Sequence, residues 1–186
     1  QSLAALERYD DADRAFTAAA EVDPESHLPL LNLGVYLRSR GEHARSLAAL
    51  ESAAERMGQL QPDVRVIREL GFTYLAMGRL DEAEGTLYSV VEHYASRGNH
   101  DQLDPAAGIA LARLYEDRDQ PARAADIYRH LAVGRDVANH FVYNLAAARL
   151  LRAGGGPREL VRRYLDRAEE LAGDEETRAR VAALRD

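Results

Sequence analysis

The chain of 186 residues contains no cysteine, no tryptophan and no lysine. The absence of cysteine excludes disulfide bonds, thiol nucleophiles and cysteine metal ligands. Every basic residue is therefore arginine, which we attribute to coding bias rather than to function. The net charge of −7 argues against general nucleic-acid binding, because that function needs a positive surface. No apolar run reaches the ~18 residues of a membrane span.

Familiar signatures of catalysis and of cofactor binding are also missing. The glycine run 154–156 is followed by Pro157 and Arg158, whereas a phosphate-binding loop has Lys and then Ser or Thr after a strand. We interpret this run as a turn between helices. No histidine pair has zinc-protease spacing, and we expect surface histidines rather than a metal site even for the three nearest the longest connection: His93, His100 and His130. We therefore expect no enzymatic activity, no cofactor and no metal.

The segment 66–94 has the pattern of two amphipathic helices joined by a tight turn. Four residues lie at i, i+3, i+4 and i+7, which places them on one face of the first helix: Ile67, Leu70, Gly71 and Tyr74. Gly78 ends this helix, because glycine readily adopts the left-handed conformation of a helix end. Asp81 then begins the second helix, where an acidic group suits the positive end of the dipole. The small residues Gly71 and Ala83 would let the two helices approach closely.

This unit recurs along the chain. Its second helix has one large residue at a fixed place in each copy, with steps of 34, 37, 41 and 37 residues: Phe16, Leu50, Leu87, Tyr128 and Leu165. Four positions earlier stands a small residue in four copies and the larger Val161 in the fifth: Ala12, Ser46, Ala83, Ala124 and Val161. The pattern Leu-Gly-x-x-Tyr, then Gly, then Ala-x-x-x-Leu resembles the tetratricopeptide repeat signature, whose unit is a helix–turn–helix of 34 residues. Ile67 replaces the leading tryptophan of that signature.

The resemblance implies an all-α fold, a right-handed superhelical solenoid of antiparallel helix pairs that forms one domain over residues 1–186. We expect the following units: a half repeat 1–25, repeats 26–61, 62–98, 102–135 and 136–173, and a terminal helix 174–186. Because the chain starts within a repeat and without methionine, we expect it to be part of a longer polypeptide. A cytoplasmic location is favoured, although truncation could hide a signal peptide.

Proteins with this signature use their first helices to line a concave groove. The resemblance therefore implies a non-catalytic protein–protein interaction module that binds a protein or peptide segment in this groove. Because the candidate residues are locally positive on an acidic chain, we expect that segment to carry apolar side chains and an acidic residue. The candidate partner-binding residues are Arg65, Arg68, Phe72, Arg113, His140, Tyr143 and Asn144. The alternative for much of this row is packing between repeats. Two other functions stay open, a self-associating scaffold and an accessory domain of a larger enzyme or regulator, and the oligomeric state is unknown.

Two further arginine features bear on binding. One subclass of tetratricopeptide repeat proteins grips a C-terminal carboxylate with Lys, Asn and Arg, but Glu69 stands where that Arg belongs, so we reject this mode. The last complete helix also has a basic stripe with acidic residues interleaved: Arg158, Arg162, Arg163 and Arg167. We interpret the stripe as exposed pairs at i, i+4. A patch for an acidic partner is the alternative.

Overall fold

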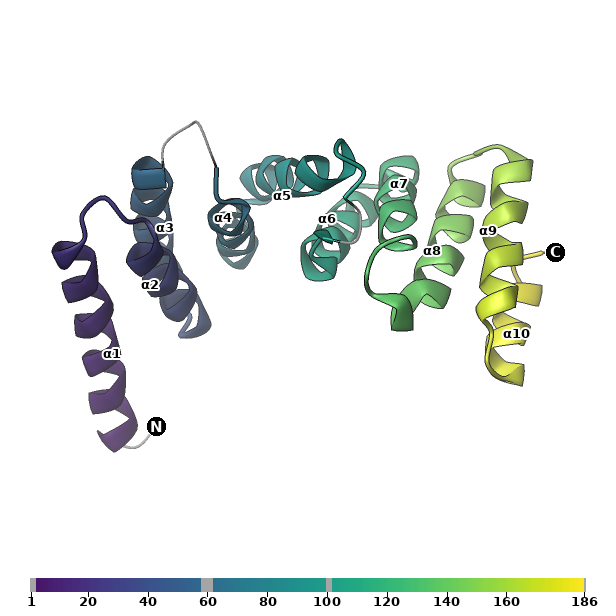
Figure 1. Ribbon diagram of the computed structural model, residues 1–186. Helices are drawn as coiled ribbons and strands as arrows, with labels where there is room; N and C mark the ends of the chain where they lie inside the picture. The colour runs from purple at the N-terminus through teal and green to yellow at the C-terminus, as the bar shows by residue number, and fades with distance from the viewer. Residues whose placement is uncertain (1–2, 58–61, 100–101, 186) are drawn as a thin grey trace. The chain divides into compact units, whose positions relative to one another are not determined.

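The computed structural model describes residues 3–57, 62–99 and 102–185, and in these ranges it is all-α, with ten α-helices and no strand (Figure 1). The expected all-α class is confirmed. The helices are α1 (Leu3–Val22), α2 (Leu28–Ser39), α3 (His43–Met57), α4 (Val64–Ala76), α5 (Leu80–Ala95), α6 (Pro105–Asp117), α7 (Pro121–Leu131), α8 (His140–Ala153), α9 (Arg158–Leu171) and α10 (Glu175–Ala182). A short 3₁₀ helix, η2 (Val137–Asn139), precedes α8. None of the helices in the described ranges is long and apolar enough to cross a membrane.

The chain divides into two compact units, residues 1–86 and residues 87–186, and each is described by itself. The division falls within α5. The repeat boundaries given above stay a prediction.

In the 1–86 unit, α2 and α3 pack as a close pair because small residues lie where the helices meet. A Cβ atom at Gly34 would lie only 2.4 Å from Cγ of Leu50, so the glycine lets α3 approach α2. The fully buried Ser46 donates a hydrogen bond of 2.7 Å to the carbonyl oxygen of Gly34. A core cluster joins the pair to α4: Leu31, Leu50, Ala53 and Val66.

The same close approach recurs in the 87–186 unit. A Cβ atom at Gly108 in α6 would lie 2.8 Å from Cδ2 of Leu131 in α7. Helices α8, α9 and α10 share a second core cluster, whose buried members are Leu145, Ala148, Leu165, Ala168 and Val181. Val181 ties the short α10 to the α8–α9 pair, and it is only 1% exposed.

Left-handed residues end the first helix of several pairs. Gly41, Gly78 and Gly155 have φ angles of +79°, +71° and +70°, and each follows a helix end. Asp119 takes the same role after α6 with φ of +54°, which aspartate tolerates better than most residues. The helix end expected at Gly78 is therefore confirmed, and after α6 an aspartate has the left-handed conformation that glycine has in the other turns.

Candidate partner-binding site

Helix α4 begins at a network centred on Asp63. The Asp63 side chain accepts a hydrogen bond of 3.0 Å from the backbone N–H of Arg65, which caps the helix. The Arg65 side chain also donates to this carboxylate, and Nε2 of His27, the residue before α2, lies 3.0 Å from it. The hydrogen bonds from Arg65 hold the pKa of Asp63 well below its usual range, against the opposing effect of burial. Arg65, a candidate binding residue, is thus engaged with its own helix cap while more than half of its side chain is exposed.

One turn further along α4, two arginines converge on one buried carboxylate. Nη2 of Arg38, at the end of α2, donates to Oε2 of Glu69 at 2.8 Å. Arg68 donates to Oε1 of the same carboxylate from Nε and Nη2, at 3.1 and 2.9 Å. The Glu69 side chain is 5% exposed, whereas those of Arg38 and Arg68 are 31% and 30% exposed. We call Arg38, Arg68, Glu69 and Phe72 the Glu69 cluster, and its formal charge is +1.

Phe72 lies one turn after Arg68 and completes this cluster. The guanidinium carbon of Arg38 is 5.5 Å from the centroid of the Phe72 ring, within reach of a cation–π interaction. Arg38 is therefore held from two sides, by a carboxylate and by an aromatic ring. Its buried Nε has no hydrogen-bond partner among the described residues. The arrangement combines an oriented positive charge with an apolar surface.

The three candidates at the start of α8 are mostly engaged within their own unit. Tyr143 is 2% exposed, and its hydroxyl donates to Asp136 in the loop before η2. Asn144 is 3% exposed and donates to the backbone oxygen of His140 at 2.7 Å. Nε2 of His140 lies 2.8 Å from the carbonyl oxygen of Gly134. Tyr143 and Asn144, both candidate partner-binding residues, are thus buried inside the unit, as the alternative of packing would have it.

The environment of Tyr143 shows why it is buried. Its ring stacks on that of Tyr128 at 6.3 Å between centroids. Burial, followed by the hydrogen bond to the charged Asp136, raises the pKa of Tyr143 above its usual range. The same bond lowers the pKa of Asp136. The hydroxyl therefore stays protonated and ties the loop before α8 to the helix.

A second carboxylate with an arginine lies on α6. Glu116 accepts hydrogen bonds from the hydroxyl of Tyr128 at 3.1 Å and from Nη2 of Arg149 at 2.5 Å. Burial, together with the charge of Glu116, raises the pKa of Tyr128 to about 12. The candidate Arg113 is exposed on α6, and its positive charge opposes that rise in the pKa of Tyr128. Arg113 is thus exposed and charged, whereas Tyr143 is buried.

Sequence reasoning missed the part that Glu69 plays. It counted this residue only against a carboxylate-gripping mode. The signal was nevertheless present, since Glu69 stands between Val66 and Thr73 at i+3 and i+7, on the buried face of α4. A charged residue on a buried face needs a partner of opposite charge. Of the three histidines nearest the longest connection, which we expected to be surface residues, His100 lies outside the described residues.

Comparison with known proteins relates the chain to solved structures only. No protein-family model matches it, and no curated protein matches it either. The structure of MamA is similar with a TM-score of 0.61 at 17% identity, over 91% of this chain and 94% of that one. A tetratricopeptide repeat protein from Parabacteroides merdae gives a TM-score of 0.60 at 16% identity, over 95% of this chain and 67% of that one. The structure of PilF of Pseudomonas aeruginosa gives a TM-score of 0.56 at 20% identity, over 92% of this chain and 72% of that one.

At these identities a structural likeness is evidence for a shared fold. Paired helices, close glycine contacts and left-handed turn residues agree with that likeness. The chain has the fold of the tetratricopeptide repeat proteins.

Proposed function

We propose that the chain is a non-catalytic module that binds another protein, and that the 1–86 unit contacts a partner segment carrying an acidic and an apolar side chain. The observation that carries the proposal is the Glu69 cluster, in which a buried carboxylate orients Arg38 beside Phe72. The shared fold supports a binding role in general, because helical repeat proteins offer extended surfaces for other proteins.

The charge of the cluster favours an acidic group on the partner. Two arginines and one carboxylate meet at this partly exposed site, on a chain whose net charge is −7. Among the described residues, Arg38 makes its hydrogen bond to Glu69 through Nη2 alone. The guanidinium has five N–H donors in a planar fork that matches a carboxylate. Arg38 is therefore the residue that we expect to meet the partner's acidic side chain.

The cluster is also held in place before binding. Arginine loses much side-chain freedom when it is fixed by a ligand, and this loss opposes association. Glu69 and the Phe72 ring already restrict Arg38 in the free protein. Phe72, which is half-buried, supplies the apolar part of the contact. In the 87–186 unit, the proposal retains Arg113 and His140 as contact residues, and assigns Tyr143 and Asn144 to packing.

Selection from a library of random displayed peptides tests the proposal. The wild-type chain should enrich peptides with an acidic residue next to a large apolar one. The Arg38→Ala and Phe72→Ala variants should lose that enrichment. Arg14→Ala is the matched control, since Arg14 is an exposed arginine on α1 with 75% of its side chain accessible.

Unchanged selection by both variants would contradict the proposal. Circular dichroism of each variant must show wild-type helicity, because unfolding would also abolish binding. If both variants unfold, the cluster serves packing and the proposal fails. Light scattering at several concentrations separates this function from a self-associating scaffold, whose mass would rise with concentration.

A further inference from the structure

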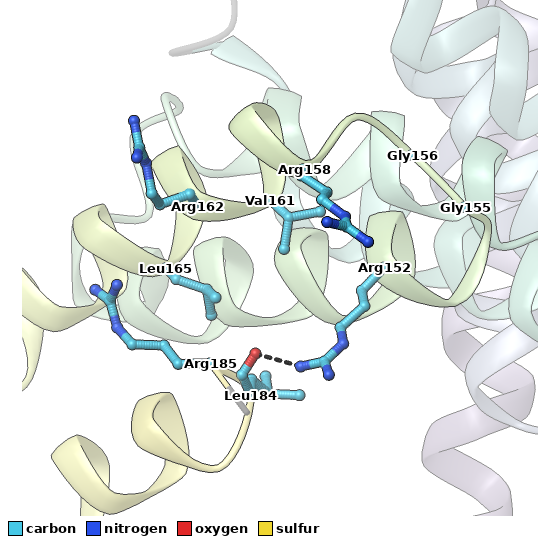
Figure 2. A pocket seen from close by; sticks show the side chains of 9 residues that line it. All are labelled: Arg152, Gly155, Gly156, Arg158, Val161, Arg162, Leu165, Leu184 and Arg185. Carbon is cyan, nitrogen blue, oxygen red and sulfur yellow. Dashed lines mark hydrogen bonds between the residues drawn. The ribbon is translucent and has the colours of Figure 1, made fainter.

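The C-terminal part of the 87–186 unit contains an open pocket of about 810 Å³, formed by the end of α8, the turn before α9, α9 itself and the residues that follow α10 (Figure 2). Most of its lining residues are either arginine or aliphatic. The lining residues are Arg152, Gly155, Gly156, Arg158, Val161, Arg162, Leu165, Leu184 and Arg185. We call this the arginine pocket.

The charged side chains along the wall of this pocket are arginines. Among the described residues that line it, four are arginine and none is aspartate or glutamate, on a chain whose net charge is −7. Arg185 is held by Asp166 and Glu169 at 2.7 and 2.6 Å, and Nη1 of Arg152 donates to the carbonyl oxygen of Leu184 at 2.6 Å. Two of the four arginines, Arg152 and Arg185, are thus held by contacts within the unit.

The other two arginines of the pocket lack such contacts. Within the described residues, Arg158 and Arg162 form no ion pair and no side-chain hydrogen bond. Both belong to the basic stripe, for which exposed pairs at i, i+4 were expected. In the described ranges, the ion pair of the stripe is instead between Arg167 and Glu170, at i and i+3. Two guanidinium groups are therefore available to an acidic ligand.

An apolar strip separates the arginines. Figure 2 shows Arg152 and Arg158 toward one end of the pocket and Arg162 and Arg185 toward the other, with Val161, Leu165 and Leu184 between them. Leu165 is 3% exposed and belongs to the core, so the floor is fixed. The pattern fits an apolar side chain with carboxylates on both sides of it.

The turn before α9, with Gly155 and Gly156, forms one wall of the pocket. Gly155 has φ of +70°, and the N–H of Gly156 donates to the carbonyl oxygen of Leu151 at 2.7 Å. A Cβ atom at position 156 would lie 2.9 Å from that same oxygen, so a side chain there would displace the turn. The glycines hold the turn against α8 and thereby fix where α9 begins, with Arg158 at its first residue.

We propose that the arginine pocket is a second protein-binding site, which takes an acidic segment of a partner protein with an apolar side chain between its carboxylates. Charge complementarity and the apolar floor both favour this occupant over a small inorganic anion, which would leave the floor uncovered. The site lies wholly in the 87–186 unit, and it stands independently of the function proposed for the Glu69 cluster.

Fluorescence anisotropy with a short labelled peptide that alternates glutamate and leucine tests this assignment. The probe is titrated with the full chain carrying Phe72→Ala, so that binding at the Glu69 cluster does not contribute. Binding should weaken with added salt, because exposed charges are screened. The same peptide with glutamine in place of glutamate should bind much less.

The doubly substituted Arg158→Gln, Arg162→Gln chain should bind the glutamate peptide about tenfold more weakly or worse, as expected for loss of charge-assisted hydrogen bonds. The control is Arg178→Gln, an exposed arginine of α10 outside the pocket, which should bind as before. Equal binding by the double variant would overturn the assignment. So would equal binding of the glutamine peptide, displacement of the probe by an equal concentration of inorganic phosphate, or a rise in mass with concentration that the double variant abolishes.

Discussion

Replacing Gly34 by alanine should destabilise the 1–86 unit, because the added methyl group has no space. An ideal Cβ there would lie 2.4 Å from Cγ and 2.6 Å from Cδ2 of Leu50, distances that real Cβ atoms do not show. Leu50 cannot simply move aside, since it is fully buried in a cluster with Leu31 and Val66. Either α2 and α3 must separate or Leu50 must leave its rotamer.

The two opposing contributions can be compared in size. Overpacking a core costs roughly 1–3 kcal/mol. Replacing glycine by alanine within a helix gains about 0.5–1 kcal/mol. The difference of these ranges runs from zero to about 2.5 kcal/mol, so we expect Gly34→Ala to lower the free energy of unfolding by about 1 kcal/mol. Urea unfolding followed by far-ultraviolet circular dichroism measures this as a lower midpoint at an unchanged slope.

Gly85 provides a control of opposite sign. It lies within α5, and a Cβ atom there would meet nothing within 4 Å, so Gly85→Ala should raise stability by about 0.5–1 kcal/mol. The clash itself is tested in the Leu50→Ala background, where Gly34→Ala should no longer destabilise. If Gly34→Ala costs the same with and without the Leu50 side chain, the reasoning from close helix contact is refuted.

Two other predictions concern stability. Ala83→Leu should cost roughly 1–3 kcal/mol by overpacking a fully buried position, whereas Ser96→Leu, at an exposed turn, should change the melting temperature little; similar shifts for both would mean that the repeat register is wrong. Asp63 has a lowered pKa in the folded state, so its stabilising effect is complete above its unfolded pKa of about 3.9 and is lost as the pH falls further. Asp63→Asn, which keeps a helix cap, should lower the melting temperature at neutral pH and converge with wild type in acid.

Much of the fold was predictable because local spacing and packing agree. The columns of small and large residues mark the places where the helices meet, and Ser46, Leu50, Ala83 and Leu87 are all fully buried. Glycine at a turn position likewise predicted where a helix ends, as at Gly78, which has a positive φ angle. These features depend on residues close together in sequence or at a regular interval, which a repeat makes visible.

The candidate site was harder to predict, because its residues are set by contacts outside the repeat pattern. Tyr143 was expected on the inner face of its helix, yet its ring stacks on Tyr128 and its hydroxyl donates to Asp136 in the loop before η2. The Glu69 cluster depends on Arg38, which is 31 positions earlier in the chain. Spacing within one helix shows which face a residue occupies. It does not show which loop covers that face.

The basic stripe shows the same difficulty. Its interleaved charges favoured pairs along one helix, but α10 folds back on the α8–α9 pair through Val181 and brings Arg185 to the acidic residues Asp166 and Glu169. Asp166 and Glu169 thus form ion pairs with Arg185, which lies outside α9. Arg158 and Arg162 then line a pocket instead of pairing with neighbours.

The central claim, that Arg38 in the Glu69 cluster meets an acidic group of a partner, is tested most directly by a double-mutant cycle. Calorimetry would measure the affinity of a selected peptide and of its Glu→Gln form for the wild-type chain and for Arg38→Ala. The account predicts a coupling free energy of at least about 0.5 kcal/mol between Arg38 and the peptide's acidic residue. Strictly additive losses would contradict it, because the arginine and the acidic group would then act independently.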